Sequence, residues 1–287
     1  MGRDDGDAAL TVILGLLAAI SYGIGDFVGG IASRRHTATT VLLHSYPVGA
    51  VLMVALLPAF PGHLDGRVVL FGVLGGLAGL VGVAVMYSLM VVAPMNIVSP
   101  VTAVLAAIVP IVVGVIVGDR PHVTAWFGIV LGIAAVMLVS RTTDDHPHGR
   151  VGVRVLALAT VAGLGFGFYF VFLARAGGDE AGLWPLVISR ISSAMAIVPL
   201  GLRLRAFHRI RGRMLGITLL SGVLDAGANM FFLLATRHGL LSLAAVLTSL
   251  YPAFTVLLAV GLLHEHTTRA QRAGLGLAAA SIVLITV

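Results

Sequence analysis

Two similar stretches decide the fold of this chain: SPVTAVLAAIVPIVVGVIVGDRPHVTAWFGIVLGIAAVMLVS at residues 99–140 and AAVLTSLYPAFTVLLAVGLLHEHTTRAQRAGLGLAAASIVLITV at residues 244–287. Each contains an apolar run that ends in an acidic residue, then a short polar turn and a final apolar run with glycine. Moving residues 90–140 forward by 146 positions superposes Thr102 on Thr248, Asp119 on Glu265, Gly128 on Gly274 and Leu131 on Leu277. A weaker match, at an offset of 142, pairs YGIGDF at 22–27 with LGFGFY at 164–169. The pattern indicates an internal repeat.

The composition of the whole chain is strongly apolar. Of the 287 residues, 59% are hydrophobic and only 10% are charged, whereas a soluble domain is about 45–50% apolar and about 25% charged. The charges divide the chain into ten apolar runs, each near the length of about 20 residues that a membrane helix needs. The runs are 8–31, 38–60, 68–91, 95–118, 122–140, 151–174, 183–202, 214–236, 240–263 and 271–287.

Ten runs and one duplication imply a repeat unit of five helices. Because five is odd, the second copy enters the membrane in the opposite sense to the first. The predicted fold is therefore an all-α integral membrane protein with ten transmembrane helices, arranged as two inverted five-helix repeats. The first repeat covers residues 1–140, a connecting loop covers 141–150 and the second repeat covers 151–287. This topology is typical of secondary transporters, whose substrate site lies near the midplane between the halves.

Arginines suggest the orientation, since all 18 basic residues are Arg and the formal net charge is +6. Twelve lie on one side of the predicted membrane, namely Arg34, Arg35, Arg141, Arg150, Arg154, Arg203, Arg205, Arg209, Arg211, Arg213, Arg269 and Arg272. Five lie on the other side, namely Arg3, Arg67, Arg120, Arg175 and Arg237. Because cytoplasmic loops are enriched in basic residues, both termini are predicted to lie outside. No basic stripe is interleaved with aromatic residues, so a nucleic-acid partner is not predicted.

The repeated stretches resemble the closing helices of the EamA domain, which occurs twice in the ten-helix members of the drug/metabolite transporter superfamily. The resemblance extends over almost the whole chain and is strongest in the second copy, where Tyr251-Pro252 and Glu265 match the family pattern. In the first copy Asp119 replaces the usual glutamate, and Ala106 aligns with the proline. The resemblance implies a multi-pass protein of the cell membrane that transports a small metabolite, amino acid or drug, often as an exporter.

Three ionisable residues lie inside the apolar runs: Asp26, Arg190 and Asp225. A charge in the middle of a bilayer costs at least about 2.5–3.5 kcal/mol, so such residues usually face a bundle interior or a watery cavity and pair with one another. Tyr22 lies four residues before Asp26, and Asn229 lies four residues after Asp225, so each pair shares one helix face. We predict that these residues face a common site.

Two interpretations of these residues stay open. A phenol and an amide beside carboxylates would suit an amine or an amino-acid backbone, and Arg190 could hold a substrate carboxylate bidentately. Alternatively, Arg190 and Asp225 form a permanent ion pair that locks two helices. Asp26 is either a carrier of protons or substrate, or simply the partner of Arg34 or Arg35 in the adjoining loop.

Tyr87 and Tyr251 complete the predicted site, because they lie on helices matched by the repeat or by its family pattern. Tyr251 precedes Pro252, where a helix loses a hydrogen bond and is expected to bend. The predicted substrate-binding residues are thus Tyr22, Asp26, Tyr87, Arg190, Asp225, Asn229 and Tyr251.

The glycines of FGVLGGLAGLVG at 71–82 have a packing interpretation. Gly72 and Gly76 are four residues apart, as are Gly75 and Gly79. Small residues at this spacing allow helices to approach closely, so the segment predicts two tightly packed seams.

Other chemistry is missing from the sequence. Without a lysine the chain cannot form a phosphate-binding P-loop, and HEH at 264–266 lacks the spacing that places two imidazoles on one helix face. HPH at 146–148 is a loop pair, and we predict no catalytic residue, metal or cofactor. The prediction is a secondary transporter that moves a small solute across the bilayer by alternating access, with a proton or another ion as a possible coupling partner. The alternatives are an integral-membrane enzyme acting on a lipid or isoprenoid-linked substrate, and a membrane scaffold without transport.

Overall fold

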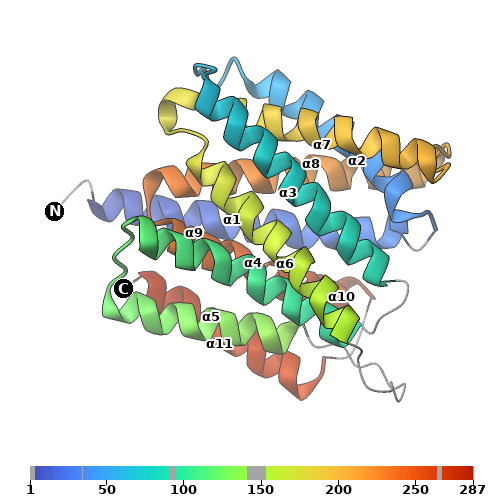
Figure 1. The fold of residues 1–287 in the computed structure, drawn as a ribbon. Helices are drawn as coiled ribbons and strands as arrows, with labels where there is room; N and C mark the ends of the chain where they lie inside the picture. The colour runs from blue at the N-terminus through green and yellow to red at the C-terminus, as the bar shows by residue number, and fades with distance from the viewer. Residues whose placement is uncertain (1–3, 34, 91–94, 141–152, 264–266, 287) are drawn as a thin grey trace.

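The computed structural model describes residues 4–286 apart from 34, 91–94, 141–152 and 264–266, and all regular secondary structure within these residues is helical (Figure 1). In chain order the helices are α1 (Asp4–Ser33), α2 (Ala38–Leu56), α3 (Gly66–Met90), α4 (Met95–Val117), α5 (Val123–Val139), α6 (Val153–Arg175), the 3-10 helix η1 (Asp179–Ala181), α7 (Trp184–Arg203), α8 (Gly212–His238), α9 (Leu241–Ser249), α10 (Tyr251–Leu263) and α11 (Arg269–Thr286).

Seven helical segments among the described residues are long and apolar enough to cross a bilayer. They are Gly6–Gly29, Thr39–Leu56, Gly66–Met86, Val153–Arg175, Trp184–Arg203, Gly212–His238 and Leu241–Leu262. Val101–Val117 and Val123–Val139 are apolar but shorter, and α11 has Arg269 and Arg272 in its first turn. The prediction of an all-helical protein with several membrane-spanning helices is confirmed.

Side-chain caps explain where several helices begin. The carboxylate of Asp65 accepts a hydrogen bond from the backbone N–H of Val68 at the start of α3, with a donor–acceptor distance of 2.7 Å. At the start of α11, Thr268 and Gln271 each accept from the other's backbone N–H at 3.0 Å, which is a capping box. The carboxylate of Asp119, which follows α4, accepts from the backbone N–H of Ser242 at 2.8 Å and so caps α9. Such caps stabilise a helix by about 1 kcal/mol.

The predicted run 240–263 is broken at Leu250, between α9 and α10. Pro252 has no backbone N–H, so it cannot continue the hydrogen-bond ladder. The N–H of Leu250 turns instead to the carbonyls of Leu247 and Thr248. The bend that the sequence predicts at Tyr251-Pro252 is confirmed, and it divides the run into two helices.

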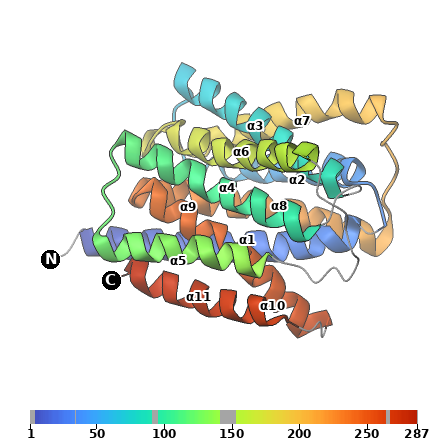
Figure 2. The same cartoon turned by 60° about the horizontal axis from the view of Figure 1, so that its bottom comes forward.

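The helices pack in pairs that occur twice (Figures 1 and 2). The contact of α1 with α8 corresponds to that of α6 with α3. The contact of α2 with α8 corresponds to that of α7 with α3. In the same way α4 packs against α6, while α9 and α10 pack against α1. α2 with α7 and α5 with α11 form two further pairs, and α5 and α11 lie on the side of the bundle away from α3 and α7.

The glycines of α3 form the two seams that the sequence predicts. The Cβ positions of Gly72 and Gly76 would meet atoms of α7, whereas those of Gly75 and Gly79 would meet atoms of α6, including the ring of Tyr169. α3 is therefore held between α6 and α7 by two small-residue faces, as expected where helix backbones approach closely.

One of these close contacts has a counterpart in the other half of the chain. The Cβ position of Gly76 would overlap the carbonyl of Ser189 in α7, and that of Gly222 in α8 would overlap the carbonyl of Ser45 in α2. Gly222 follows Gly76 by 146 positions and Ser189 follows Ser45 by 144. The repeat is thus visible as an equivalent helix contact in both halves.

Hydrogen bonds link α2 and the loop after it to α7 and the loops beside it, and they do so at both ends of the bundle. At the end of the bundle where both chain termini lie (Figure 1), which we call the termini end, the indole N–H of Trp184 donates to the carbonyl of Gly62 at 3.1 Å. The N–H of His63 donates to the carbonyl of Glu180 there at 2.7 Å. At the opposite end, the hydroxyl of Thr40 donates to the carbonyl of Ala206 at 2.8 Å.

Candidate functional site

A cavity lies where the two halves of the chain meet. α1, α2, α3 and α4 line it from the first half, and α6, α7, α8 and α10 from the second. The space open to the centres of water-sized molecules is about 150 Å³. A single water needs about 10–15 Å³ on this measure, so the cavity has room for a small solute. Its polar lining consists of Tyr22, Asp26, Ser45, Tyr46, Tyr169, Ser189, Arg190, Ser193, Ser221, Asp225, Asn229 and Tyr251.

Six of the seven residues predicted for the site line this one cavity: Tyr22, Asp26, Arg190, Asp225, Asn229 and Tyr251. Tyr87 lies near the end of α3, and its side chain lies outside the part of the chain that the structure describes. The six predicted residues come from four of the lining helices, α1, α7, α8 and α10.

Tyr22 and Asn229 connect the two halves across the cavity. The hydroxyl of Tyr22 in α1 donates a hydrogen bond to Oδ1 of Asn229 in α8 at 2.6 Å. The Nδ2 of Asn229 donates in turn to the backbone carbonyl of Asp225, also at 2.6 Å. The four-residue spacing of Asp225 and Asn229 thus places both on one face of α8, as the sequence predicts.

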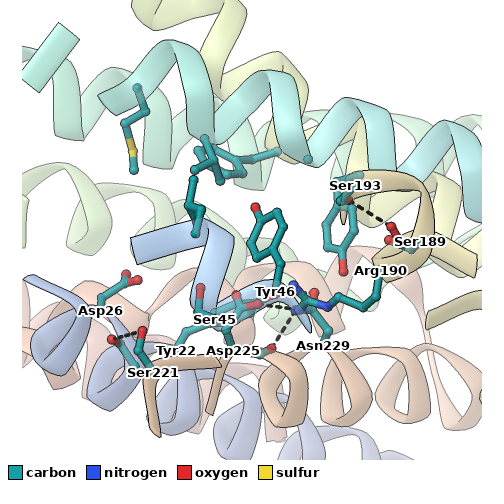
Figure 3. A pocket seen from close by; sticks show the side chains of 18 of the residues that line it. Tyr22, Asp26, Ser45, Tyr46, Ser189, Arg190, Ser193, Ser221, Asp225 and Asn229 are labelled. Carbon is teal, nitrogen blue, oxygen red and sulfur yellow. Dashed lines mark hydrogen bonds and ion pairs between the residues drawn. The ribbon is translucent and has the colours of Figure 1, made fainter. Parts of the chain in front are cut away.

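Arg190 and Asp225 form the ion pair that the sequence predicts as one possibility (Figure 3). The pair joins α7 to α8 past Gly49 of α2, whose Cβ position would lie 3.6 Å from Nε of Arg190. The guanidinium also lies over the ring of Tyr46, 5.5 Å from its centroid. The side chain of Arg190 is 7% exposed and that of Asp225 is 38% exposed. Arg190 is therefore enclosed by protein, whereas Asp225 still faces the cavity.

Asp26 lies apart from this ion pair, near Ser221 (Figure 3). Its side chain is exposed to the cavity. The hydroxyl of Ser221 does not bind it but donates to the carbonyl of Gly25 at 3.1 Å. Asp26 makes no ion pair with Arg35 or with any other residue in the described ranges, and Arg34 lies outside those ranges.

The aromatic lining surrounds Tyr22. Its ring centroid lies 6.0 Å from that of Tyr251 and 6.2 Å from that of Phe170. Tyr169 continues this wall, with its ring centroid 5.6 Å from that of Phe170. One side of the cavity is thus formed by aromatic side chains from α1, α6 and α10.

Sequence reasoning missed the uncharged lining residues of α2 and α7. Ser45, Tyr46, Ser189 and Ser193 lie in apolar runs and carry no charge that would mark them. A signal was present, because Ser45-Tyr46 and Ser189-Arg190 are related by 144 positions, close to the offset of the repeat. A search for polar residues at equivalent repeat positions would have found Ser45, Tyr46 and Ser189 but not Ser193, whose counterpart at this offset is Gly49.

Comparison with known proteins is consistent with this architecture. The family model described as "EamA-like transporter family" matches residues 9–141 and again residues 153–287. The chain belongs to the EamA-like transporter family, as a two-repeat protein of the drug/metabolite transporter type.

A solved structure described as "Crystal structure of protein" is similar in fold, with a TM-score of 0.79 at 15% sequence identity. The match covers 96% of this chain and 95% of that one. No curated protein matches the sequence. The family is one of transporters, so the integral-membrane enzyme alternative is not favoured.

Proposed function

We propose that the protein is a secondary transporter that moves a small solute across the cytoplasmic membrane by alternating access, with the cavity as its substrate site. The observation that carries the proposal is that one cavity is lined by helices of both halves and contains the charged residues of the apolar runs. A solute bound between two halves can be released to either side when the halves rock against each other.

The proposed architecture is ten transmembrane helices in two inverted repeats, residues 1–140 and 151–287. Three observations support it: the helix pairs that pack together occur twice, the contacts of Gly76 and Gly222 are equivalent, and both termini lie at one end of the bundle. An even number of crossings places both termini on one side. In this arrangement α9 and α10 together form one crossing, broken at Leu250.

Access to the cavity is proposed to alternate through α2 and α7. Because hydrogen bonds link these helices through their adjoining loops at both ends of the bundle, parting them at one end while the other stays linked exposes the cavity to one side only. The arginine-rich end is proposed to be cytoplasmic, which leaves the termini outside. Export then begins with solute entering from the end opposite the termini.

Proton or ion coupling is assigned to Asp26 in this proposal, because its carboxylate is exposed to the cavity while Asp225 is engaged by Arg190. A carboxylate that binds and releases a proton during each cycle couples the proton gradient to solute movement. We expect Asp26→Asn to abolish uphill transport, while downhill exchange persists at solute concentrations high enough to fill the site.

Sealed vesicles containing the purified protein provide the test. Solute that crosses the vesicle membrane chemically unchanged supports a transporter. A chemically altered product would identify an enzyme, and neither flux nor product would leave a non-transporting scaffold. Undiminished pH-driven accumulation by the Asp26→Asn variant would remove the coupling mechanism while leaving transport itself intact.

A further inference from the structure

We propose that the cavity takes a small primary amine in its ammonium form, with an apolar or aromatic body, and discriminates against carboxylic acids and α-amino acids. The inference rests on the proposed transport function, and it narrows the solute to one chemical class. It is carried by the charges of the cavity, by the direction of its hydrogen bonds and by its aromatic wall.

The charge balance of the cavity is negative. Its lining contains two carboxylates, Asp26 and Asp225, and one guanidinium, Arg190. Arg190 pairs with Asp225, lies over Tyr46 and is 7% exposed, although its Nε has no hydrogen-bond partner among the described residues. This Nε is buried beside Gly49 of α2 and is not open to the cavity. The group left for a solute is the exposed carboxylate of Asp26, which attracts a cation.

Several hydrogen-bond donors of the lining are used within the protein. The hydroxyl of Ser193 donates to the carbonyls of Gly76 and Ser189, at 2.8 and 2.9 Å. The hydroxyl of Ser221 donates to a backbone carbonyl of α1, and that of Tyr22 donates to Asn229. Each hydroxyl has one proton to donate but two lone pairs that accept.

Where Tyr22, Ser193 and Ser221 donate to the protein and the carboxylate of Asp26 is exposed, the cavity offers acceptors to a ligand. The matching ligand group supplies several donors and needs no acceptor. An ammonium group has three N–H donors and no lone pair, so it fits this requirement better than an alcohol, an amide or an acid.

The aromatic wall favours the same class. Cations are attracted to aromatic ring faces within about 6 Å, and the apolar part of a ligand gains from contact with the same rings. Tyr22, Phe170 and Tyr251 form such a wall beside the carboxylates. The room of about 150 Å³ limits the ligand to a small molecule.

An α-amino acid fits less well, because its carboxylate would have to find a cation in the same cavity. Arg190 already shares its charge with Asp225 and is 7% exposed, so a second carboxylate would compete with Asp225 for it and bring two negative charges close together. Unpaired and like charges in a partly dry site are costly. The ion pair thus acts as a filter against anions.

The test uses three ligands with the same aromatic body: 2-phenylethylamine, L-phenylalanine and 3-phenylpropanoate. Binding to the purified full-length protein in detergent is measured by calorimetry at neutral pH. We expect the amine to bind at least about 100-fold more tightly than the propanoate, and more tightly than the amino acid. Asp26→Asn should weaken amine binding by about tenfold or more, because a charge-assisted hydrogen bond is lost.

Asp7→Asn is the matched control, because Asp7 lies on the same helix 19 residues before Asp26, about 28 Å along the axis. Its binding of the amine should equal that of the unchanged protein. Equal or tighter binding of the propanoate or the amino acid, no binding of the amine, or an equal loss in both variants would overturn the inference.

Flux of the same ligands into vesicles separates this inference from the proposed function. Amine binding without flux would retain the ligand class and remove the transport function. Flux of the acid or the amino acid but not of the amine would retain transport and remove the ligand class.

Discussion

Removing Asp225 from its ion pair with Arg190 should destabilise the protein more than removing Arg190. Asp225→Asn leaves the guanidinium of Arg190, 7% exposed, without its counter-ion. Removing one partner of a buried pair costs about 3–5 kcal/mol. Arg190→Gln leaves the carboxylate of Asp225 instead, and that side chain is 38% exposed and faces the cavity, where water can solvate it. Arg190→Gln also loses the contact with the ring of Tyr46, and we expect it to lower the free energy of unfolding by about 1–2 kcal/mol.

The double variant Arg190→Gln/Asp225→Asn removes both charges and leaves neither unpaired. It should be more stable than Asp225→Asn alone, by about 2 kcal/mol, so the two costs are not additive. The free energies of unfolding are measured by titrating each variant with a denaturing detergent in mixed micelles and following helix content by circular dichroism. The reasoning would be refuted if the two single variants lost equal unfolding free energy. It would also be refuted if the double variant lost the sum of the two single losses.

Three further outcomes are expected. Gly222→Ala should lower stability by about 1–3 kcal/mol, since its Cβ would overlap the carbonyl of Ser45, whereas Gly216→Ala on the same helix meets open space and should leave the unfolding midpoint unchanged or slightly raised. Asp119→Ala should cost about 1 kcal/mol through loss of the cap on α9, and Asp119→Asn, which keeps an oxygen acceptor, should cost less; equal losses in the same unfolding titration would argue against capping. Because the chain has no cysteine, Ser221→Cys gives a single reporter in the cavity for a membrane-impermeant thiol reagent applied to either side of vesicles. Trp184→Phe should raise labelling from the termini side and Thr40→Val from the opposite side, since each removes the hydrogen bond at its own end; shifts in the same direction would contradict alternating access through α2 and α7.

Much of the fold was predictable because a bilayer allows few solutions. In an apolar chain, every charge marks the end of a helix or a group that must be paired or hydrated. This reasoning predicted the helical architecture, the bend at Tyr251-Pro252 and the seams of α3. It did not predict which helices pack against one another, because an apolar run does not show which of its faces meets which neighbour.

The site was predictable only in its charged members. Asp26, Arg190 and Asp225 were found because charge is expensive in an apolar run, and Tyr22 and Asn229 because helical spacing places them beside those charges. That Arg190 reaches Asp225 past Gly49 follows from α2 lying against both α7 and α8, which periodicity does not encode.

The hydrogen bonds between the segments that adjoin α2 and α7 also favour one conformation of the empty protein. Among the described residues, two hydrogen bonds join the connecting segments at the termini end, through Trp184 and His63, and one joins them at the opposite end, through Thr40. A hydrogen bond contributes about 1 kcal/mol net, which corresponds to about a fivefold difference in population.

We therefore expect the empty protein to spend most of its time closed at the termini end and ready to load from the arginine-rich side. On this view the cavity determines what is carried, while a few hydrogen bonds in the connecting segments determine from which side the cycle starts. The loops should then be the place to reverse the preferred direction of loading without altering the choice of solute.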